Sequence, residues 1–145
     1  MTISSLSLSK VVIMLILASF NLNVSMIDGQ VAPQPIAVDV TINNKLLDSD
    51  LKFHCKDQHS AQVDLGDQTV STGRSWSFKF LASPFYVPLY SCTFSWHGAP
   101  DRHFDIYEGE RDGKACNQDC TWDIYEINPC RVSGTDQQCF PWKEG

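Results

Sequence analysis

The sequence lacks a long apolar run, lacks clustered basic residues and lacks any helical pattern longer than one turn. Its longest apolar run covers residues 11–20, whereas a membrane-spanning helix needs about 20 residues. Lys and Arg total 11 against 17 Asp and Glu, the formal net charge is −6, and the basic residues are scattered singly. These features argue against stable membrane insertion and against nucleic acid as a partner, because both kinds of binding rely on apolar spans or clustered cations.

The chain also lacks the motifs of common catalytic and metal sites. No serine stands in a GxSxG setting, and no second cysteine or histidine pair accompanies Cys116 and Cys120 to complete a zinc site. Four histidines fall at outward strand positions or in turns, where solvated side chains are expected: His54, His59, His97 and His103. The sequence therefore predicts neither an enzyme nor a protein with a metal or cofactor.

The N-terminus has the layout of a secretory signal peptide. Lys10 precedes the apolar run Val11–Phe20, and small and polar residues follow up to Gln30. The signal peptide is predicted to occupy residues 1–29, with cleavage at about residue 25–30. A secreted, extracellular chain of roughly 115–120 residues remains, which is enough for one domain.

All six cysteines follow this segment, and an even number in a secreted chain predicts up to three disulfides. Six cysteines allow 15 pairings, so the spacing leaves the connectivity open. The disulfide candidates are Cys55, Cys92, Cys116, Cys120, Cys130 and Cys139.

Short stretches of alternating apolar and polar residues, separated by turn signals, predict seven or eight strands. They lie at residues 38–42, 51–55, 61–65, 75–80, 90–96, 104–107 and 122–125. Strands with one apolar face must bury that face on a second layer. The predicted fold is therefore an all-β, small antiparallel β-sandwich of two four-stranded sheets, stapled by disulfides. Trp76, Trp96 and Trp122 are expected in its core.

Two segments show no strand periodicity. Residues 82–89 contain Pro84 and Pro88 and are predicted to form a loop, with Phe85 and Tyr86 folded back as local packing. Residues 133–145 are predicted to form a tail, tied down only if Cys139 is disulfide-bonded.

Acidic residues are close together in and after the strand at residues 104–107. Paired carboxylates could indicate a glycosidase, but such a pair needs a cleft and a protected acid. At a strand and its flanking loops we expect a solvated rim instead. The acidic residues concerned are Asp101, Asp105, Glu108, Glu110 and Asp112.

Eight short pieces, in order from about Val38 to Val132, carry a resemblance to a known family. They are VTINN (40–44), LKFHCK (51–56), DLG (64–66), WSF (76–78), CTFSW (92–96), FDIY (104–107), RD (111–112) and CTW (120–122). Through these pieces the chain resembles the plant self-incompatibility S1 family, the S-protein homologues. The resemblance implies an S1-type domain at residues 30–132 and a C-terminal tail at residues 133–145 that exceeds the usual family end.

The resemblance further implies a secreted, ligand-like protein of plant cell-to-cell signalling. In poppy, similar members are stigma determinants that a pollen membrane protein perceives, causing rejection of self pollen. A non-enzymatic, monomeric recognition protein perceived by an unknown cell-surface receptor is therefore expected. The alternative is a small secreted hydrolase or carbohydrate-binding module acting in the cell wall.

Partner binding is expected in two polar loops beside the central strands, His97–His103 and Glu108–Gln118, because a rigid sandwich leaves its loops free to vary. Disulfides from Cys55 and Cys92 to the C-terminal group Cys116, Cys120 and Cys130 are favoured. The candidate partner-binding residues are His97, Asp101, Arg102, His103, Glu108, Glu110, Arg111, Asp112 and Lys114.

Overall fold

The computed structural model describes residues 33–144, so the predicted signal peptide at residues 1–29 lies outside the described residues. The chain divides after Gln34 into two compact units, and every described strand belongs to the second unit, which begins at Pro35. Within residues 33–144, no helix combines the length and the apolar character needed to cross a membrane.

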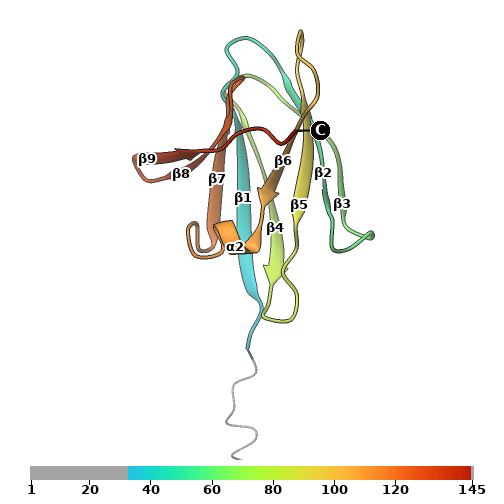
Figure 1. Ribbon diagram of the computed structural model, residues 1–145, viewed down its shortest axis with the longest axis vertical. Helices are drawn as coiled ribbons and strands as arrows, with labels where there is room; N and C mark the ends of the chain where they lie inside the picture. The colour runs from blue at the N-terminus through green and yellow to red at the C-terminus, as the bar shows by residue number, and fades with distance from the viewer. Residues whose placement is uncertain (1–32, 145) are drawn as a thin grey trace, which may run out of the picture. The chain divides into compact units, whose positions relative to one another are not determined.

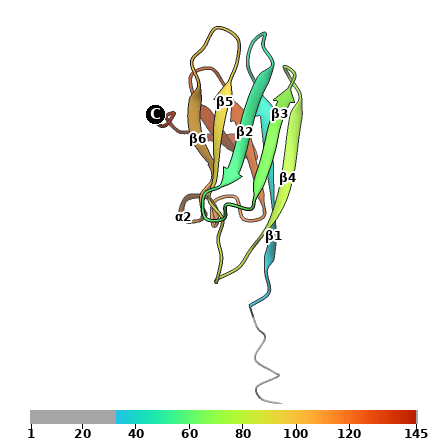
Figure 2. The same cartoon turned by 90° about the vertical axis from the view of Figure 1, so that its right-hand side faces the viewer.

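Two sheets form the predicted sandwich (Figures 1 and 2). The five-stranded sheet contains, in spatial order, β4 (Ser75–Ala82), β1 (Ile36–Asn44), β7 (Asp119–Ile124), β8 (Pro129–Ser133) and β9 (Asp136–Cys139). The four-stranded sheet contains β3 (Asp64–Val70), β2 (Leu51–Asp57), β5 (Tyr90–Ser95) and β6 (Arg102–Tyr107). One short helix, α2 (Gly109–Asp112), links β6 to β7. The all-β sandwich is confirmed, with two sheets of five and four strands.

One strand pair departs from the expected antiparallel arrangement. β1 and β7 run parallel, with Ile42 opposite Trp122, whereas the other strand pairs are antiparallel. The parallel pair arises because the chain leaves β6, crosses through α2 to the other sheet and re-enters it beside β1. Residues 108–118, which include α2, form this connection between the two sheets.

The core lies between the sheets and follows the predicted period of two. In β1, Val38, Val40 and Ile42 are buried, while the residues between them are partly exposed. Trp122 is wholly buried, whereas Trp76 and Trp96 are half-buried and pack at the edge of the core. The prediction that the three tryptophans lie in the core is therefore confirmed for Trp122, whereas Trp76 and Trp96 are only partly buried.

Three disulfides pair all six cysteines, and the favoured connectivity was wrong. Cys55 bonds Cys92, Cys116 bonds Cys120, and Cys130 bonds Cys139. The first and third bonds join residues directly opposite each other on neighbouring antiparallel strands. The expected bridges from Cys55 and Cys92 to the C-terminal cysteines fail because β2 and β5 pair with each other, whereas those cysteines belong to the other sheet or to the loop before β7.

The third strand lies later in the chain than predicted. β3 spans Asp64–Val70 rather than residues 61–65, so Gly66 lies inside the strand instead of ending it. Gly66 has a positive φ of 72°, and its N–H donates to the Asp64 carboxylate at 2.8 Å. The β2–β3 register shifts between His54 and Lys56, opposite this point. Glycine serves here as the residue of a β-bulge.

The predicted tail after Val132 is tied down by Cys139, as the condition on its disulfide required, and it also contains a strand that no periodicity indicated. β9 pairs with β8, and the Cys130–Cys139 disulfide joins the two strands. The chain then crosses to the four-stranded sheet, where the Lys143 N–H donates to the His103 carbonyl at 2.9 Å. Trp142 packs against Phe94 with ring centroids 5.7 Å apart. These last residues connect the two sheets at the β6 edge.

Replacing Trp142 with alanine should therefore loosen this edge. We expect the free energy of unfolding to fall by about 2 kcal/mol, less than for a fully buried tryptophan, because the side chain is only half-buried. Urea denaturation with the disulfides intact measures the change. Ile127→Ala is the control, since that side chain is largely exposed and should change stability by less than about 0.5 kcal/mol. Equal stability of Trp142→Ala and the unmodified protein would contradict the assignment.

Candidate functional site

The two loops predicted to bind a partner lie at opposite ends of the sandwich (Figure 1). The turn at residues 96–101 precedes β6, and residues 108–118 follow it. Six strand residues separate them, which corresponds to about 20 Å along the strand. The loops therefore do not form one surface. The end that carries residues 58–63, 83–89 and 108–118 is called the α2 end below.

At the other end, the predicted residues differ in accessibility. His97 and Asp101 are exposed, whereas Arg102 is half-buried. His103 is exposed, but its ring lies 3.1 Å from Thr93 Oγ1 and its carbonyl accepts the Lys143 N–H. Only the tip of this turn is thus free to meet a partner.

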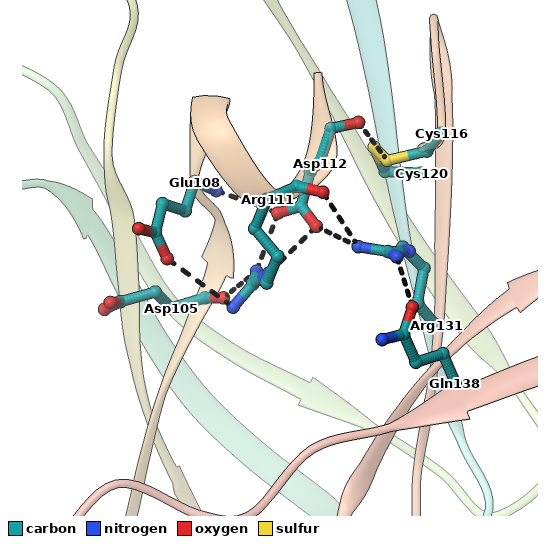
Figure 3. Close-up of a disulfide and its surroundings, with 8 residues drawn as sticks. All are labelled: Asp105, Glu108, Arg111, Asp112, Cys116, Cys120, Arg131 and Gln138. Carbon is teal, nitrogen blue, oxygen red and sulfur yellow. Dashed lines mark hydrogen bonds and ion pairs between the residues drawn. A yellow bond between two sulfur atoms is a disulfide. The ribbon is translucent and has the colours of Figure 1, made fainter. Parts of the chain in front are cut away.

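At the α2 end, the helix is built around a buried carboxylate (Figure 3). Asp112 is 0% exposed, so its predicted role as a partner-facing loop residue was wrong. Its side chain accepts the Glu108 N–H at 2.9 Å and the Arg131 Nη1 at 2.6 Å. Arg111 adds two bonds, from Nε at 2.9 Å and from Nη2 at 2.6 Å. Burial of a charge is tolerable here because all of these donors compensate it.

Arg111 faces the core rather than a partner, which corrects its expected place on an exposed loop. Its guanidinium carbon lies 4.8 Å from the Phe104 ring centre and 4.9 Å from that of Trp122. Its Nη2 also donates to the Asp105 carbonyl at 2.6 Å. A guanidinium packed on aromatic faces and bound to a carboxylate is fixed in position.

Arg131 connects this cluster to the five-stranded sheet. It extends from β8, binds Asp112 through Nη1, and donates from Nη2 to Gln138 Oε1 of β9 at 2.7 Å. The Cys116–Cys120 disulfide closes the segment on the other side (Figure 3). The Cys116 N–H donates to the Asp112 carbonyl at 2.9 Å. The backbone of residues 108–118 is therefore fixed by the buried Asp112–Arg131 ion pair and by the Cys116–Cys120 disulfide.

The remaining predicted residues of this loop point to solvent. Glu110 and Lys114 are exposed, and Glu108 is half-exposed. Glu108 comes only within 4.0 Å of Arg111, a guanidinium that Asp112 already binds. A fixed backbone thus presents three charged side chains.

A second buried carboxylate, Asp57, anchors the loop at residues 83–89. It ends β2 and accepts hydrogen bonds from the Leu89 N–H at 3.0 Å, the His59 N–H at 2.9 Å and the Tyr86 hydroxyl. The bond to Asp57, followed by desolvation, raises the pKa of Tyr86 to about 12. The phenol therefore remains a proton donor at neutral pH.

This anchoring leaves the tip of the loop in solvent. Ser83 and Tyr86 pair as an isolated bridge around the tip, and Phe85 between them is 86% exposed. The expectation that Phe85 folds back was wrong, because Asp57 draws Tyr86 inward while the tight turn points its neighbour away.

The 83–89 loop and α2 meet to form an open groove. A methyl group at Gly109 would lie 2.5 Å from Val87 Cγ1, so only glycine permits this approach. The groove has a volume of about 680 Å³. Its lining includes Ala82, Val87, Pro88, Tyr107, Glu108 and Glu110.

The acidic residues were expected to form a solvated rim, and this was wrong for two of the five, Asp105 and Asp112. Asp105 is buried and binds Ser91 Oγ and Lys143 Nζ. Asp112 is bound by two arginines. Among residues 33–144, no group of three His, Cys, Asp or Glu residues is placed to hold a metal ion. Three of the five carboxylates remain accessible to water: Asp101 lies at the opposite end of the sandwich, and Glu108 and Glu110 line an open groove rather than a closed cleft.

His54 is engaged rather than simply solvated. Its Nε2 lies 2.6 Å from Asp64 and its Nδ1 lies 2.7 Å from Asp67, both on the neighbouring strand β3. The hydrogen bond to Asp67 raises the pKa of His54 above its usual 6.5, against a smaller opposing effect of desolvation. The Gly66 N–H and His54 lower the pKa of Asp64.

Sequence reasoning missed three residues that organise the α2 end: Asp57, Arg131 and Gln138. A signal for Asp57 was present, because it occupies the next inward position of the strand after Leu51, Phe53 and Cys55. No local signal identified Arg131 or Gln138, since their roles depend on β8 and β9 lying beside the helix.

The sequence is similar to those of a known family of plant proteins. Residues 39–142 match the sequence profile of the family described as "Plant self-incompatibility protein S1", which extends past the expected domain end at Val132. The chain is 40% identical over 113 residues to S-protein homolog 2 of Arabidopsis thaliana, covering 72% of this chain and 68% of that protein. It is 29% identical over 92 residues to Self-incompatibility protein S1 of Papaver rhoeas, covering 63% and 62%.

A solved structure of SPH (Self-Incompatibility Protein Homologue) proteins has a similar fold. Its title describes a widespread family of small, highly stable, secreted proteins from plants. The TM-score is 0.53 at 16% identity, covering 76% of this chain and 97% of the other. The likeness supports the sandwich architecture.

Removal of the Asp112 carboxylate should destabilise the protein strongly. In Asp112→Ala, Arg131 and Arg111 lose their buried counter-charge, and we expect a loss of about 3–5 kcal/mol in the free energy of unfolding. Chemical denaturation with intact disulfides measures it. Glu110→Ala, two residues earlier and exposed, should change stability by less than about 0.5 kcal/mol. A mild effect of Asp112→Ala would refute the structural role of this carboxylate.

Stability should also depend on His54 and pH. Since the folded-state pKa of His54 is raised above 6.5, its stabilisation is complete below pH 6.5 and is lost as pH rises through the folded-state pKa. We therefore expect the stability difference between the unmodified protein and His54→Gln, measured by urea denaturation, to shrink from pH 6 to pH 9. Asp67→Asn should reduce this dependence without abolishing it, because the Asp64 carboxylate remains 2.6 Å from Nε2. A difference that grows with pH would have the wrong sign.

Proposed function

The chain belongs to the plant self-incompatibility protein S1 family, and we propose that it acts as a non-enzymatic recognition protein bound by a cell-surface receptor. Family membership places it among small secreted plant proteins with disulfide bonds. Receptor binding, and action as a monomer, belong to the proposal. We place the contact at the α2 end.

One observation carries this proposal: exposed side chains stand on a backbone that buried charges hold in place. Asp112 fixes residues 108–118, and Asp57 fixes residues 83–89. Binding to a preorganised surface loses less conformational entropy than binding to a mobile loop. The turn at residues 96–101 lacks a buried charge of this kind. It is held to the rest of the protein by the His97 N–H, which donates to Ser49 Oγ at 3.3 Å.

The alternative of a secreted hydrolase or carbohydrate-binding module has less support. A hydrolase of two carboxylates needs an acid protected from water. Within residues 33–144, the buried Asp105 and Asp112 are engaged by cations, and Glu108 and Glu110 are open to water. A sugar-binding platform needs an exposed tryptophan face, and Trp76, Trp96 and Trp142 are all half-buried against other rings.

The test is saturation binding of the labelled protein, purified from plant culture medium, to cells of the source plant. We expect saturable binding that unlabelled protein displaces and that protease treatment of the cells abolishes. Glu110→Ala with Lys114→Ala, at the α2 end, should weaken binding about tenfold. Proximity labelling with the bound protein would then identify the receptor.

The matched control is His97→Ala with Asp101→Ala, two exposed residues at the opposite end. This variant should bind as the unmodified protein does. Absence of saturable binding would refute receptor recognition. A loss confined to the His97 and Asp101 variant would instead move the contact to the other end.

A further inference from the structure

We propose that the groove at the α2 end binds an extended segment of a partner protein that presents an apolar side chain next to a lysine or arginine. This inference rests on the proposed function and adds the chemistry of the partner. It follows from two features of the groove: its apolar wall and its uncompensated negative charge.

The apolar wall is formed by consecutive residues of the 83–89 loop. Val87, Pro88 and Leu89 line the groove, whereas Phe85 and Tyr86, which precede them in the loop, are exposed beside it. Scattered exposed apolar residues are common on soluble proteins, but a contiguous patch beside a groove is typical of an interaction site. Because the Asp57 bonds fix this loop, the patch persists in the free protein.

The charge of the groove is not balanced from within. Its one lysine, Lys143, already binds Asp105, and its one histidine, His59, has Nδ1 2.9 Å from the Val87 carbonyl oxygen rather than beside either glutamate. Glu110 has no hydrogen bond or ion pair with any residue from 33 to 144, and Glu108 only approaches Arg111. Two carboxylates beside an apolar wall favour a ligand that carries a cation next to an apolar group.

A second copy of the chain fits this surface poorly. In a two-fold dimer the same patch lies on both sides of the interface, so Glu108 and Glu110 of both copies would be gathered in one interface without cations to balance them. Anionic membrane surfaces are disfavoured by the same charges. A groove of about 680 Å³ is within the range of ligand pockets and suits a few side chains of a peptide.

The experiment selects peptides from a phage-displayed library of random 12-residue sequences on the immobilised protein, purified from plant culture medium. Selected peptides are then synthesised and titrated against the protein in solution. We expect enrichment of peptides that pair Lys or Arg with apolar residues. Phe85→Ser should weaken their binding at least tenfold and Glu110→Lys about three- to tenfold, with the latter effect reduced at high salt.

Matched controls are available at the opposite end. Leu47 is 88% exposed, close to the 86% of Phe85, and Asp101 is exposed like Glu110. Leu47→Ser and Asp101→Lys should leave peptide affinity unchanged. Circular dichroism in the near ultraviolet confirms that each variant is folded.

Any one of five outcomes would overturn the inference. The selection could yield no peptides, or only peptides without basic residues, or peptides whose binding Phe85→Ser and Glu110→Lys leave intact. The protein could instead dimerise through Phe85, or bind anionic phosphatidylserine vesicles more strongly than peptides. If such an outcome occurs while saturable binding to plant cells persists, the groove chemistry is wrong and the proposed function stands. If cell binding itself is absent, the proposed function fails.

Discussion

The carboxylate of Asp112 is the interaction on which the α2 end depends. It is wholly buried, and it collects donors from Glu108, Arg111 and Arg131. Through Arg131 it connects the helix to β8 and, by way of Gln138, to β9. A buried charge of this kind adds little net stability relative to apolar packing, but the loss of one partner is costly. Its effect here is to fix the geometry of one loop against both sheets.

The disulfides support the same geometry at separate places. Cys55–Cys92 joins neighbouring strands inside the core, Cys130–Cys139 ties β9 to β8, and Cys116–Cys120 closes the loop that follows α2. Each bond is local to one strand pair or one loop, so none joins the two sheets. The sheets are held together by the apolar core, by Arg131 and by the last residues of the chain.

This arrangement separates scaffold from surface within a short stretch of sequence. Arg111 and Asp112 belong to the interior, whereas Glu110 and Lys114, one or two residues away, face solvent. The 83–89 loop shows the same division, because Tyr86 is bound to Asp57 while Phe85 is exposed. A family of sandwiches built in this way can change the outward residues without disturbing the inward ones, which suits a recognition role.

The sequence by itself determined the all-β class and the inward face of most strands, because a period of two is a local property, and the apolar run at residues 11–20 predicts a secretory signal peptide. Only the tertiary structure decided which cysteines pair, that β1 and β7 run parallel, and that the two candidate loops lie at opposite ends. It also decided that Asp112 is buried and that residues 136–139 form a strand. These outcomes depend on which distant segments become neighbours in the fold. Arg131 and Gln138, for example, acquire their roles only because β8 and β9 lie beside α2.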